Sequence, residues 1–266
     1  MRTRQERGQR MAMNSVEKTL VVLRALSTPD RPRKLADLAG STGINKTTLH
    51  RILQVFTAQG YAVTTGDGSY ASGPALVALA GATLADRDLG AVARPILDNL
   101  QRQTRHTAHF AVRSGTVAVY LAKVESQEPY RMASRVGMQI ALHCTAIGKA
   151  ILAGLPDDEV RAIVAATAPL IRHTSGTIVD DAALAGELAA IRDRGYAIDE
   201  EENERNVRCV GAVVRDSAGT AIGGVSVSAL TFALPPDDVE LIGPMVVAAA
   251  DRMSRAMGAP PRGGAA

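Results

Sequence analysis

Hydrophobic residues recur at helical spacing in three short segments near the start of the chain. The first segment begins at Asn14, a residue type that caps helices, and the second spans residues 34–42. Gly43 can adopt the left-handed conformation that ends a helix. The third segment, residues 46–56, begins after Asn45, which is again a capping residue type. The pattern therefore predicts three helices separated by short turns.

Two short alternating runs, residues 61–64 and 69–72, follow the third helix. The turn between them contains Asp67 and Gly68, a pair that favours a tight hairpin. Three helices of this kind followed by a hairpin are typical of a winged helix-turn-helix. We therefore expect a DNA-binding domain over residues 14–74.

The third predicted helix has one apolar face, formed by Leu49, Ile52, Leu53 and Phe56, and no acidic residue on the other face. A helix that enters the major groove needs short polar side chains for base edges and cations for phosphates. We expect DNA contacts from this helix and its flanks: Arg33, Lys34, Asn45, Lys46, Thr47, Thr48, His50 and Arg51. The helix considered alone leaves open the alternative of an ordinary solvated surface.

An Ala- and Gly-rich run at residues 75–87 predicts a linker helix that is apolar on much of its circumference. Because a lone helix of this length is marginal in water, it needs a partner. Packing against its counterpart in a second subunit would match the two-fold symmetry of an operator. Burial within its own chain is the alternative.

The remainder of the chain, residues 88–258, alternates helical patterns with paired strand patterns. In chain order these are a helix at 89–100, strands at 107–113 and 117–124, a helix from Asp180 to Gly195, a short run at 196–199, strands at 207–215 and 221–229, and a helix from Pro236. This order favours an α+β domain with a mainly antiparallel sheet. We expect a disordered basic tail at residues 1–13 and a flexible tail at 259–266.

The charge is distributed unevenly along the 266 residues. Residues 1–74 hold 11 Lys and Arg against 5 Asp and Glu, whereas the rest of the chain holds 19 against 22. A basic first quarter is what a phosphate-binding module would show, although a solvated basic tail would look the same. No apolar run approaches the roughly 20 residues of a membrane span, no secretory signal follows the N-terminal arginines, and two cysteines make a disulfide framework unlikely. We expect a cytoplasmic protein with no membrane partner.

Four stretches in the first quarter resemble the IclR family of bacterial regulators: residues 15–20 (SVEKTL), 34–39 (KLADLA), 47–53 (TTLHRIL) and 60–61 (GY). Residues 142–150 (LHCTAIGKA) look like the effector-pocket motif of that family. The resemblance implies a ligand-responsive transcription regulator with a winged helix-turn-helix and a GAF-like effector-binding domain. It also implies three kinds of partner: an operator of double-stranded DNA, a small-molecule effector, and further copies of the chain in a homodimer or a tetramer built as a dimer of dimers.

The sequence departs from the family pattern in two places. Asn45 stands where the family commonly has proline, and the wing carries no Arg or Lys between Tyr61 and Ala75. We expect Arg33 and Lys34, or the Arg-rich tail, to supply the missing phosphate contact.

The resemblance places nine residues around the effector: Met132, Ile140, Ala146, Ile147, Asp199, Val207, Cys209, Ser226 and Ser228. The two serines share one face of a strand, as do Val207 and Cys209. Gly148 would let amides at a helix start approach an anion closely. Hydroxyls, a thiol, a carboxyl and free amides suit a small carboxylate or hydroxylated acid. The alternative is that the serines bond to backbone and that Cys209 is an ordinary buried residue.

Several enzyme-like patterns are weak on inspection. His106 and His109 are three apart on a predicted strand and so lie on opposite faces, a poor metal geometry. The acidic run at 199–204 is expected in a solvated loop or paired with nearby arginines. His143 and Cys144 are consecutive and are expected to project apart. We therefore expect no enzyme activity, no metal and no cofactor; the alternative is a small-molecule-binding enzyme or scavenger with an N-terminal assembly module.

Overall fold

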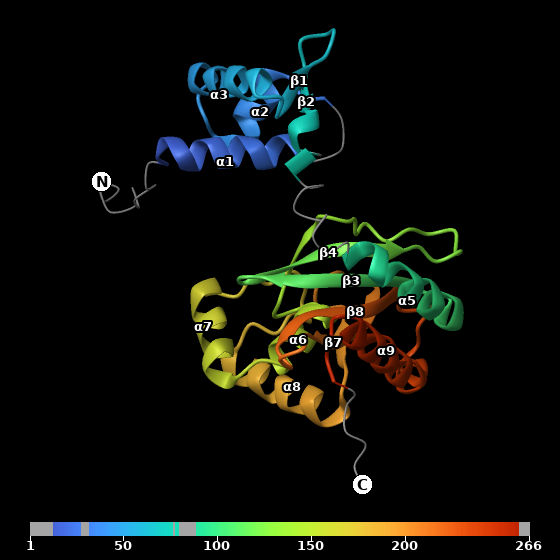
Figure 1. Cartoon of the computed structure of the whole chain (residues 1–266). Coiled ribbons are helices and arrows are strands. Elements are labelled where there is room, and N and C mark those ends of the chain that lie inside the picture. The colour runs from blue at the N-terminus through green and yellow to red at the C-terminus, as the bar shows by residue number, and fades with distance from the viewer. Residues whose placement is uncertain (1–12, 28–31, 77, 80–88, 261–266) are drawn as a thin grey trace, which may run out of the picture. The chain divides into compact units, whose positions relative to one another are not determined.

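The computed structural model describes residues 13–27, 32–76, 78–79 and 89–260 (Figure 1). The chain divides into two compact units, residues 1–87 and 88–266, and each is described by itself. Residues 1–12 of the expected N-terminal tail, residues 77 and 80–87 of the expected linker helix and residues 261–266 of the expected C-terminal tail lie outside the described residues. Residues 74–76 and 78–79, at the start of that linker, are helical.

The first unit contains three helices, α1 (Ser15–Leu26), α2 (Leu35–Thr42) and α3 (Lys46–Ala58). The expected caps are confirmed: Asn14 forms a capping box with Glu17, and the Asn45 side chain accepts a hydrogen bond from the Thr48 amide. Gly43 ends α2 with a φ of 68°, a conformation that glycine adopts without strain. Local capping chemistry therefore sets these helix ends.

The predicted wing is present as the hairpin of β1 (Ala62–Thr64) and β2 (Tyr70–Ser72). Arg33 extends it through two backbone hydrogen bonds of 2.8 Å with Tyr70. The core of this unit joins the three helices to the hairpin through its buried residues: Val22, Leu26, Leu38, Ile44, Leu49, Leu53, Phe56 and Ala62. The apolar stripe expected on the third helix thus faces this core, with Ile52 half-buried at its margin.

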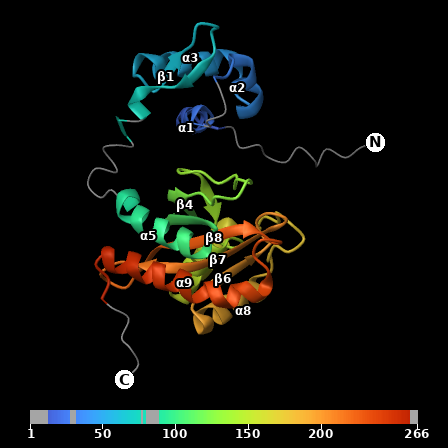
Figure 2. The same cartoon turned by 90° about the vertical axis from the view of Figure 1, so that its right-hand side faces the viewer.

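The second unit is an α+β domain built on one sheet. In chain order its elements are α5 (Leu89–Thr104), β3 (Thr107–Ser114), β4 (Val117–Val124), β5 (Gln139–Ala141), α6 (Ala146–Ala153), α7 (Asp157–Thr167), α8 (Asp181–Arg194), β6 (Ala197–Glu200), β7 (Val207–Arg215), β8 (Ala221–Leu230) and α9 (Pro236–Ala256). The six strands lie in the order β5-β4-β3-β8-β7-β6, and every neighbouring pair is antiparallel. Figure 2 shows β8, β7 and β6 in this succession. The predicted antiparallel sheet is confirmed.

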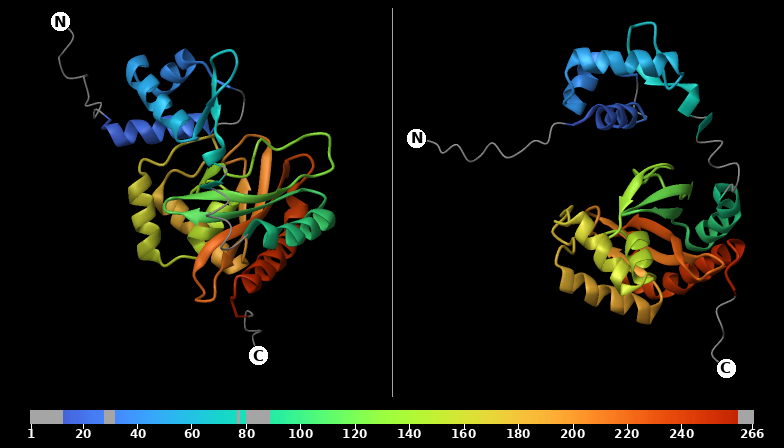
Figure 3. Two further views of the ribbon diagram at one scale, coloured as in Figure 1. Left: turned by 45° about the horizontal axis from the view of Figure 1, so that its top comes forward. Right: turned by 60° about the vertical axis from the view of Figure 1, so that its left-hand side comes forward.

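Helices cover both faces of this sheet (Figure 3). One face packs against α5 and α9 through an apolar core that includes Phe110, Val210 and Val227. The other face lies against α6, with α7 and α8 in the same apolar cluster. Because side chains alternate along a strand, the residues between those of the first core point toward α6.

Two elements, β5 and α7, have no counterpart in the sequence prediction. Strand β5 has only three residues, too few for periodicity to show. Helix α7 begins after Pro156 without a side-chain cap, although Val160, Ile163 and Val164 follow helical spacing and could have indicated it. Within the residues that the structure describes, no helix combines the length and apolar character needed to span a membrane.

Candidate DNA interface and effector site

Helix α3 presents the polar face that the sequence predicts. Lys46, Thr47, His50 and Arg51 are exposed, and Thr48 is half-buried beside α1. The first turn of α3 contains no acidic residue. The positive end of the helix dipole and the two cations therefore face solvent together, the arrangement that phosphates favour.

Three flanking candidates have structural tasks as well. Lys34 is the exposed cap residue of α2. The Arg33 guanidinium donates a 2.9 Å hydrogen bond to the Ser41 hydroxyl, so part of its donor capacity is already used. Asn45 caps α3 through the same side chain that was expected to approach DNA.

The tip of the wing carries an acid. Asp67 accepts hydrogen bonds from the Thr65 hydroxyl at 2.5 Å and from the Ser69 hydroxyl at 3.0 Å. These bonds lower the pKa of Asp67 to about 2, so the carboxylate stays ionised. A fixed negative charge at this position opposes phosphate.

In the second unit, strand pairing places four of the expected effector residues together. Asp199 on β6 pairs with Cys209 on β7, and Cys209 pairs with Ser228 on β8. Ser226 lies two residues before Ser228 and therefore on the same face. Asp199, Ser226 and Ser228 are buried, whereas Cys209 is half-buried. We call Asp199, Cys209, Ser226 and Ser228 the polar row.

His109 adjoins the polar row, although its spacing from His106 in the sequence gave no reason to expect a site there. It pairs with Ser226 across β3 and β8, and its Nε2 lies 2.8 Å from the Ser134 hydroxyl. Among the described residues Nδ1 has no hydrogen-bond partner. Burial, followed by the charge of Lys123, lowers the pKa of His109 to about 3, so the ring is neutral. Only strand register reveals this residue, because no sequence spacing links His109 to Ser226.

The first turn of α6 lies directly on the sheet next to the polar row. A Cβ at Gly211 would come within 2.7 Å of the Ala146 carbonyl carbon, so this glycine permits the close approach. No protein group in the described part of the chain accepts a hydrogen bond from the amides of Ala146 or Ile147. These two amides are therefore unpaired within the described protein, as the first amides of a helix commonly are.

The expected role of Gly148 needs correction. Its amide donates to the Thr145 hydroxyl at 3.1 Å and is not free for an anion. A Cβ at Gly148 would come within 2.5 Å of backbone atoms of Ala141 and Leu142. The glycine therefore lets α6 pack against the turn before it.

The remaining candidates lie around this site. Ile140 on β5 and Ile147 belong to the same apolar cluster, and Val207 is buried two residues before Cys209. Met132 lies in the segment after β4, where its carbonyl accepts a hydrogen bond from Lys123 at 2.8 Å. No member of the polar row lines any of five cavities that lie among the described residues.

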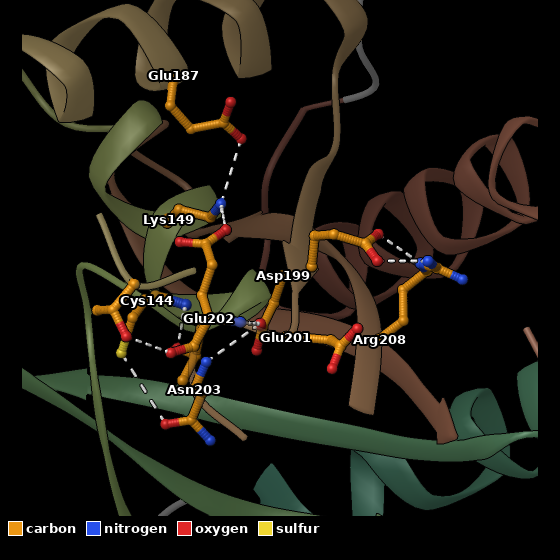
Figure 4. Close-up of polar contacts among 12 residues, drawn as sticks. Cys144, Lys149, Glu187, Asp199, Glu201, Glu202, Asn203 and Arg208 are labelled. Atoms are coloured by element: carbon orange, nitrogen blue, oxygen red, sulfur yellow. Dashed lines mark hydrogen bonds and ion pairs between the residues drawn. The ribbon is translucent and has the colours of Figure 1, made fainter. Parts of the chain in front are cut away.

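The acidic run at 199–204 is not the solvated loop that we expected. Asp199 and Glu200 belong to β6, and both Asp199 and Glu202 are buried. Lys149 on α6, 1% exposed, forms an ion pair with Glu202 and lies 3.3 Å from Glu187 on α8 (Figure 4). Only the pairing of Glu200 with Arg208 follows the prediction. The sequence did not reveal the lysine that anchors the run, because Lys149 is 53 residues away from Glu202.

Burial raises the pKa of acidic groups in the polar row and next to it. It raises the pKa of Asp199 to about 7, although the Asp199 carboxylate accepts hydrogen bonds from the amides of Glu202 and Asn203 at 2.8 and 3.3 Å. Burial also raises the pKa of Cys209 well above its usual value and that of Cys144 to about 12. Near neutral pH Asp199 thus exists in both forms, and the protonated form is a hydrogen-bond donor.

The first unit is a winged helix-turn-helix whose third helix exposes cations with no acidic residue in its first turn, and the second unit is a separate α+β domain. This combination defines a class of DNA-binding transcription regulators with an additional domain. Two family models match the chain: the IclR helix-turn-helix domain over residues 15–66 and the bacterial transcriptional regulator IclR C-terminal domain over residues 81–255. The chain belongs to the IclR family of transcription regulators. This membership decides against the alternative of an enzyme or scavenger.

Relatives of known name support the assignment. The HTH-type transcriptional regulator XynR of Escherichia coli (strain K12) is 32% identical over 251 residues, which cover 93% of this chain and 98% of XynR. The regulator KdgR of the same organism is also 32% identical, covering 93% and 94%. The crystal structure of the Thermotoga maritima IclR matches with a TM-score of 0.72 and 28% identity, covering 92% of this chain and 99% of that one. An IclR homolog from Microbacterium hydrocarbonoxydans, solved with 4-hydroxybenzoate, shares the fold at a TM-score of 0.78 and 21% identity, covering 92% and 99%.

Proposed function

We propose that this regulator binds its operator through α3 and changes its DNA affinity when a small carboxylate or hydroxylated acid binds at the polar row. The observation that carries the proposal is the separation of two unlike sites in two units. One is an exposed cationic helix face, and the other is a buried row of a carboxyl, a thiol and two hydroxyls beside free helix amides.

The DNA-binding half of the proposal assigns base contacts to Thr47, Thr48 and His50. Lys46 and Arg51 contact phosphates, with Arg33, Lys34 and Asn45 as flanking contacts. Short polar side chains at the start of a recognition helix reach base edges, whereas long cations reach the backbone. This division accounts for the mixture of residue types on one exposed face.

The effector-binding half assigns the ligand carboxylate to the amides of Ala146 and Ile147. The polar row supplies further hydrogen bonds, and Met132, Ile140 and Val207 supply apolar contact. A protonated Asp199 donates to the ligand, and the orphaned Nδ1 of His109 offers another polar contact. The relative solved with 4-hydroxybenzoate holds a molecule of this chemical class. Access to the polar row from solvent is restricted, because three of its four residues are buried and only Cys209 is half-buried. Such a site suits a small effector.

Assembly as a homodimer, or as a tetramer of two dimers, would link the two halves. Val16 and Leu20 on α1 and Val55 on α3 are 51 to 66% exposed, and large exposed apolar side chains of this kind suit contact with a second copy. Effector binding can change the spacing of two recognition helices only as far as it favours one geometry over the other.

DNA binding is tested by mobility shift of a duplex from the DNA next to the regulator's own gene. Arg51→Glu is expected to abolish the shift, whereas Ser226→Ala keeps it. Arg161→Glu, an equal charge reversal at an exposed position of the second unit, is the matched control. A wild-type shift with Arg51→Glu would exclude this face as the interface.

Effector binding is tested with a panel of small carboxylates that includes 4-hydroxybenzoate, measured as a change in DNA affinity. Ser228→Leu is expected to abolish the response and leave DNA affinity intact, because the larger side chain fills the row. Ser217→Leu, at an exposed turn, is the control. An unchanged response in Ser228→Leu contradicts the pocket assignment.

A further inference from the structure

Three metal-ligating side chains meet on the second unit, outside the DNA interface and the polar row. His143, Cys144 and His173 each offer one ligand atom, and these atoms all lie within 4.8 Å of one another. His143 and Cys144 precede α6, whereas His173 follows α7. Folding therefore joins two segments about thirty residues apart into one donor set.

The expectation that His143 and Cys144 project apart is wrong, for a local reason. Consecutive side chains alternate in a strand, but residues 142–144 form a turn between β5 and α6. In a turn the side chains of neighbouring residues can converge on one point. The sequence pattern did not indicate where the strand ends.

The imidazole of His143 is held as metal-bound histidines are held. Its Nε2 lies 3.0 Å from the Ile171 carbonyl oxygen, and because a carbonyl only accepts, Nε2 is the nitrogen that carries the proton. Nδ1 of the neutral ring then has a free lone pair. A metal-ligating histidine typically donates its second ring nitrogen to a carboxylate or backbone carbonyl in this way.

The site is also open on one side. His173 is exposed, and both histidines line one cavity of about 220 Å³. Three protein ligands with an accessible fourth position are the arrangement of a zinc ion that also holds water or a small ligand. Two imidazoles and one thiolate suit Zn²⁺ better than they suit Mg²⁺ or Ca²⁺, which prefer oxygen.

We propose that His143, Cys144 and His173 bind one Zn²⁺ ion per chain. Binding replaces the thiol proton of Cys144, which passes to solvent, with a zinc–sulfur bond. The ion joins the turn before α6 to the segment after α7. That segment also holds the acidic run, since the Thr174 and Thr177 hydroxyls donate to the carbonyls of Glu201 and Glu202 at 2.5 and 2.6 Å.

The test uses the untagged full-length protein after treatment with a chelator and dialysis. Titration with Zn²⁺ by calorimetry is expected to give one site per chain. Titration with Co²⁺ is expected to give a thiolate-to-cobalt charge-transfer band in the near ultraviolet, which a site of oxygen and nitrogen ligands lacks. Absence of stoichiometric Zn²⁺ binding overturns the proposal. These readouts require neither DNA nor effector, so they are independent of the proposed regulation.

Variants locate the ion. His173→Gln, at an exposed position that leaves the core intact, is expected to weaken Zn²⁺ binding by more than the roughly 10- to 100-fold that loss of an outer-shell partner costs. Cys144→Ser is expected to remove the charge-transfer band. Cys209→Ser and His50→Gln serve as controls of the same residue types, and both should bind Zn²⁺ with wild-type affinity. Wild-type affinity in His173→Gln, or loss of the band in Cys209→Ser, contradicts the assigned ligands.

Discussion

The two units of this regulator place their polar residues in opposite environments. On α3, Lys46 and Arg51 are exposed and have no acidic neighbour in the first turn. In the second unit Lys149 is buried between Glu187 and Glu202, and Asp199 is buried in the sheet. The first set is available to an external charge, whereas in the second set Lys149 is neutralised by its ion pairs and Asp199 is partly protonated near neutral pH.

This difference shows how one chain can separate two kinds of recognition. An exposed cationic face gains affinity from released counterions and depends strongly on salt. A buried site works through a few hydrogen bonds in a low dielectric, where protonation decides which groups donate. The comparison therefore predicts that charge changes in the second unit affect folding and pH dependence, whereas those in the first unit affect salt dependence.

The largest effect is expected from Lys149→Met. The substitution leaves the buried Glu202 carboxylate without its cation, and breaking a buried pair in this way costs about 3–5 kcal/mol. Urea unfolding followed by circular dichroism measures the loss. Arg192→Met, which breaks an exposed pair with Asp157, is the control and should cost less than about 1 kcal/mol. Equal effects of the two variants would remove the contrast between buried and exposed charge.

The second prediction concerns Asp199, whose pKa rises from 3.8 to about 7 on folding. Between these two values the unfolded chain is ionised while the folded chain keeps its proton, so this contribution to stability is complete below pH 4 and is lost as the pH rises to 7. The slope is at most about 1.4 kcal/mol per pH unit. Asp199→Asn, which mimics the protonated carboxyl, should lack this slope.

The measurement is the free energy of unfolding of wild type and variant at a series of pH values from 4 to 8. Asp158→Asn, at an exposed position, is the control and should retain the wild-type slope. A wild-type slope in Asp199→Asn would mean that another group is responsible. The same proton predicts that effector affinity falls as the pH rises through about 7.

A smaller effect is expected from Lys46→Gln at the start of α3. Loss of one phosphate contact should lower the slope of log K against log salt by about 0.9, with a uniform loss of affinity across sequences. Fluorescence anisotropy of a labelled duplex at several salt concentrations gives the slope. Arg161→Gln removes the same charge from the second unit and should leave the slope unchanged.

The smallest effect is expected at the wing tip. Asp67→Asn removes a negative charge but keeps the oxygen that accepts from Ser69 and Thr65. If the wing approaches the phosphate backbone of the DNA, DNA affinity should rise by roughly two- to fivefold at low salt and by less at high salt. No change at low salt would place Asp67 farther than about one Debye length from any phosphate.

Much of the fold follows from local sequence signals, as α8 and the last hairpin show. Asp180 caps α8 and Gly195 ends it with a φ of 85°, both as predicted. Strands β7 and β8 flank the turn at 216–219, which Asp216 stabilises by accepting from the amides of Ala218 and Thr220. These elements depend on contacts between residues close in the chain, and such contacts are visible in sequence.

The two sites differ in the same way: one follows from residues close in the chain, and the other depends on contacts between distant segments. The polar face of α3 depends on helical periodicity alone, so the chain itself determines that Lys46, His50 and Arg51 are exposed. Strand register, which couples residues far apart in the chain, decides that His109 adjoins Ser226, and the turn before α6 decides that Cys144 joins two histidines. Burial of Lys149 against Glu202 likewise exists only in the folded chain. Short-range spacing fixes which surface a helix presents, whereas the neighbours and protonation of a buried group depend on packing between distant segments.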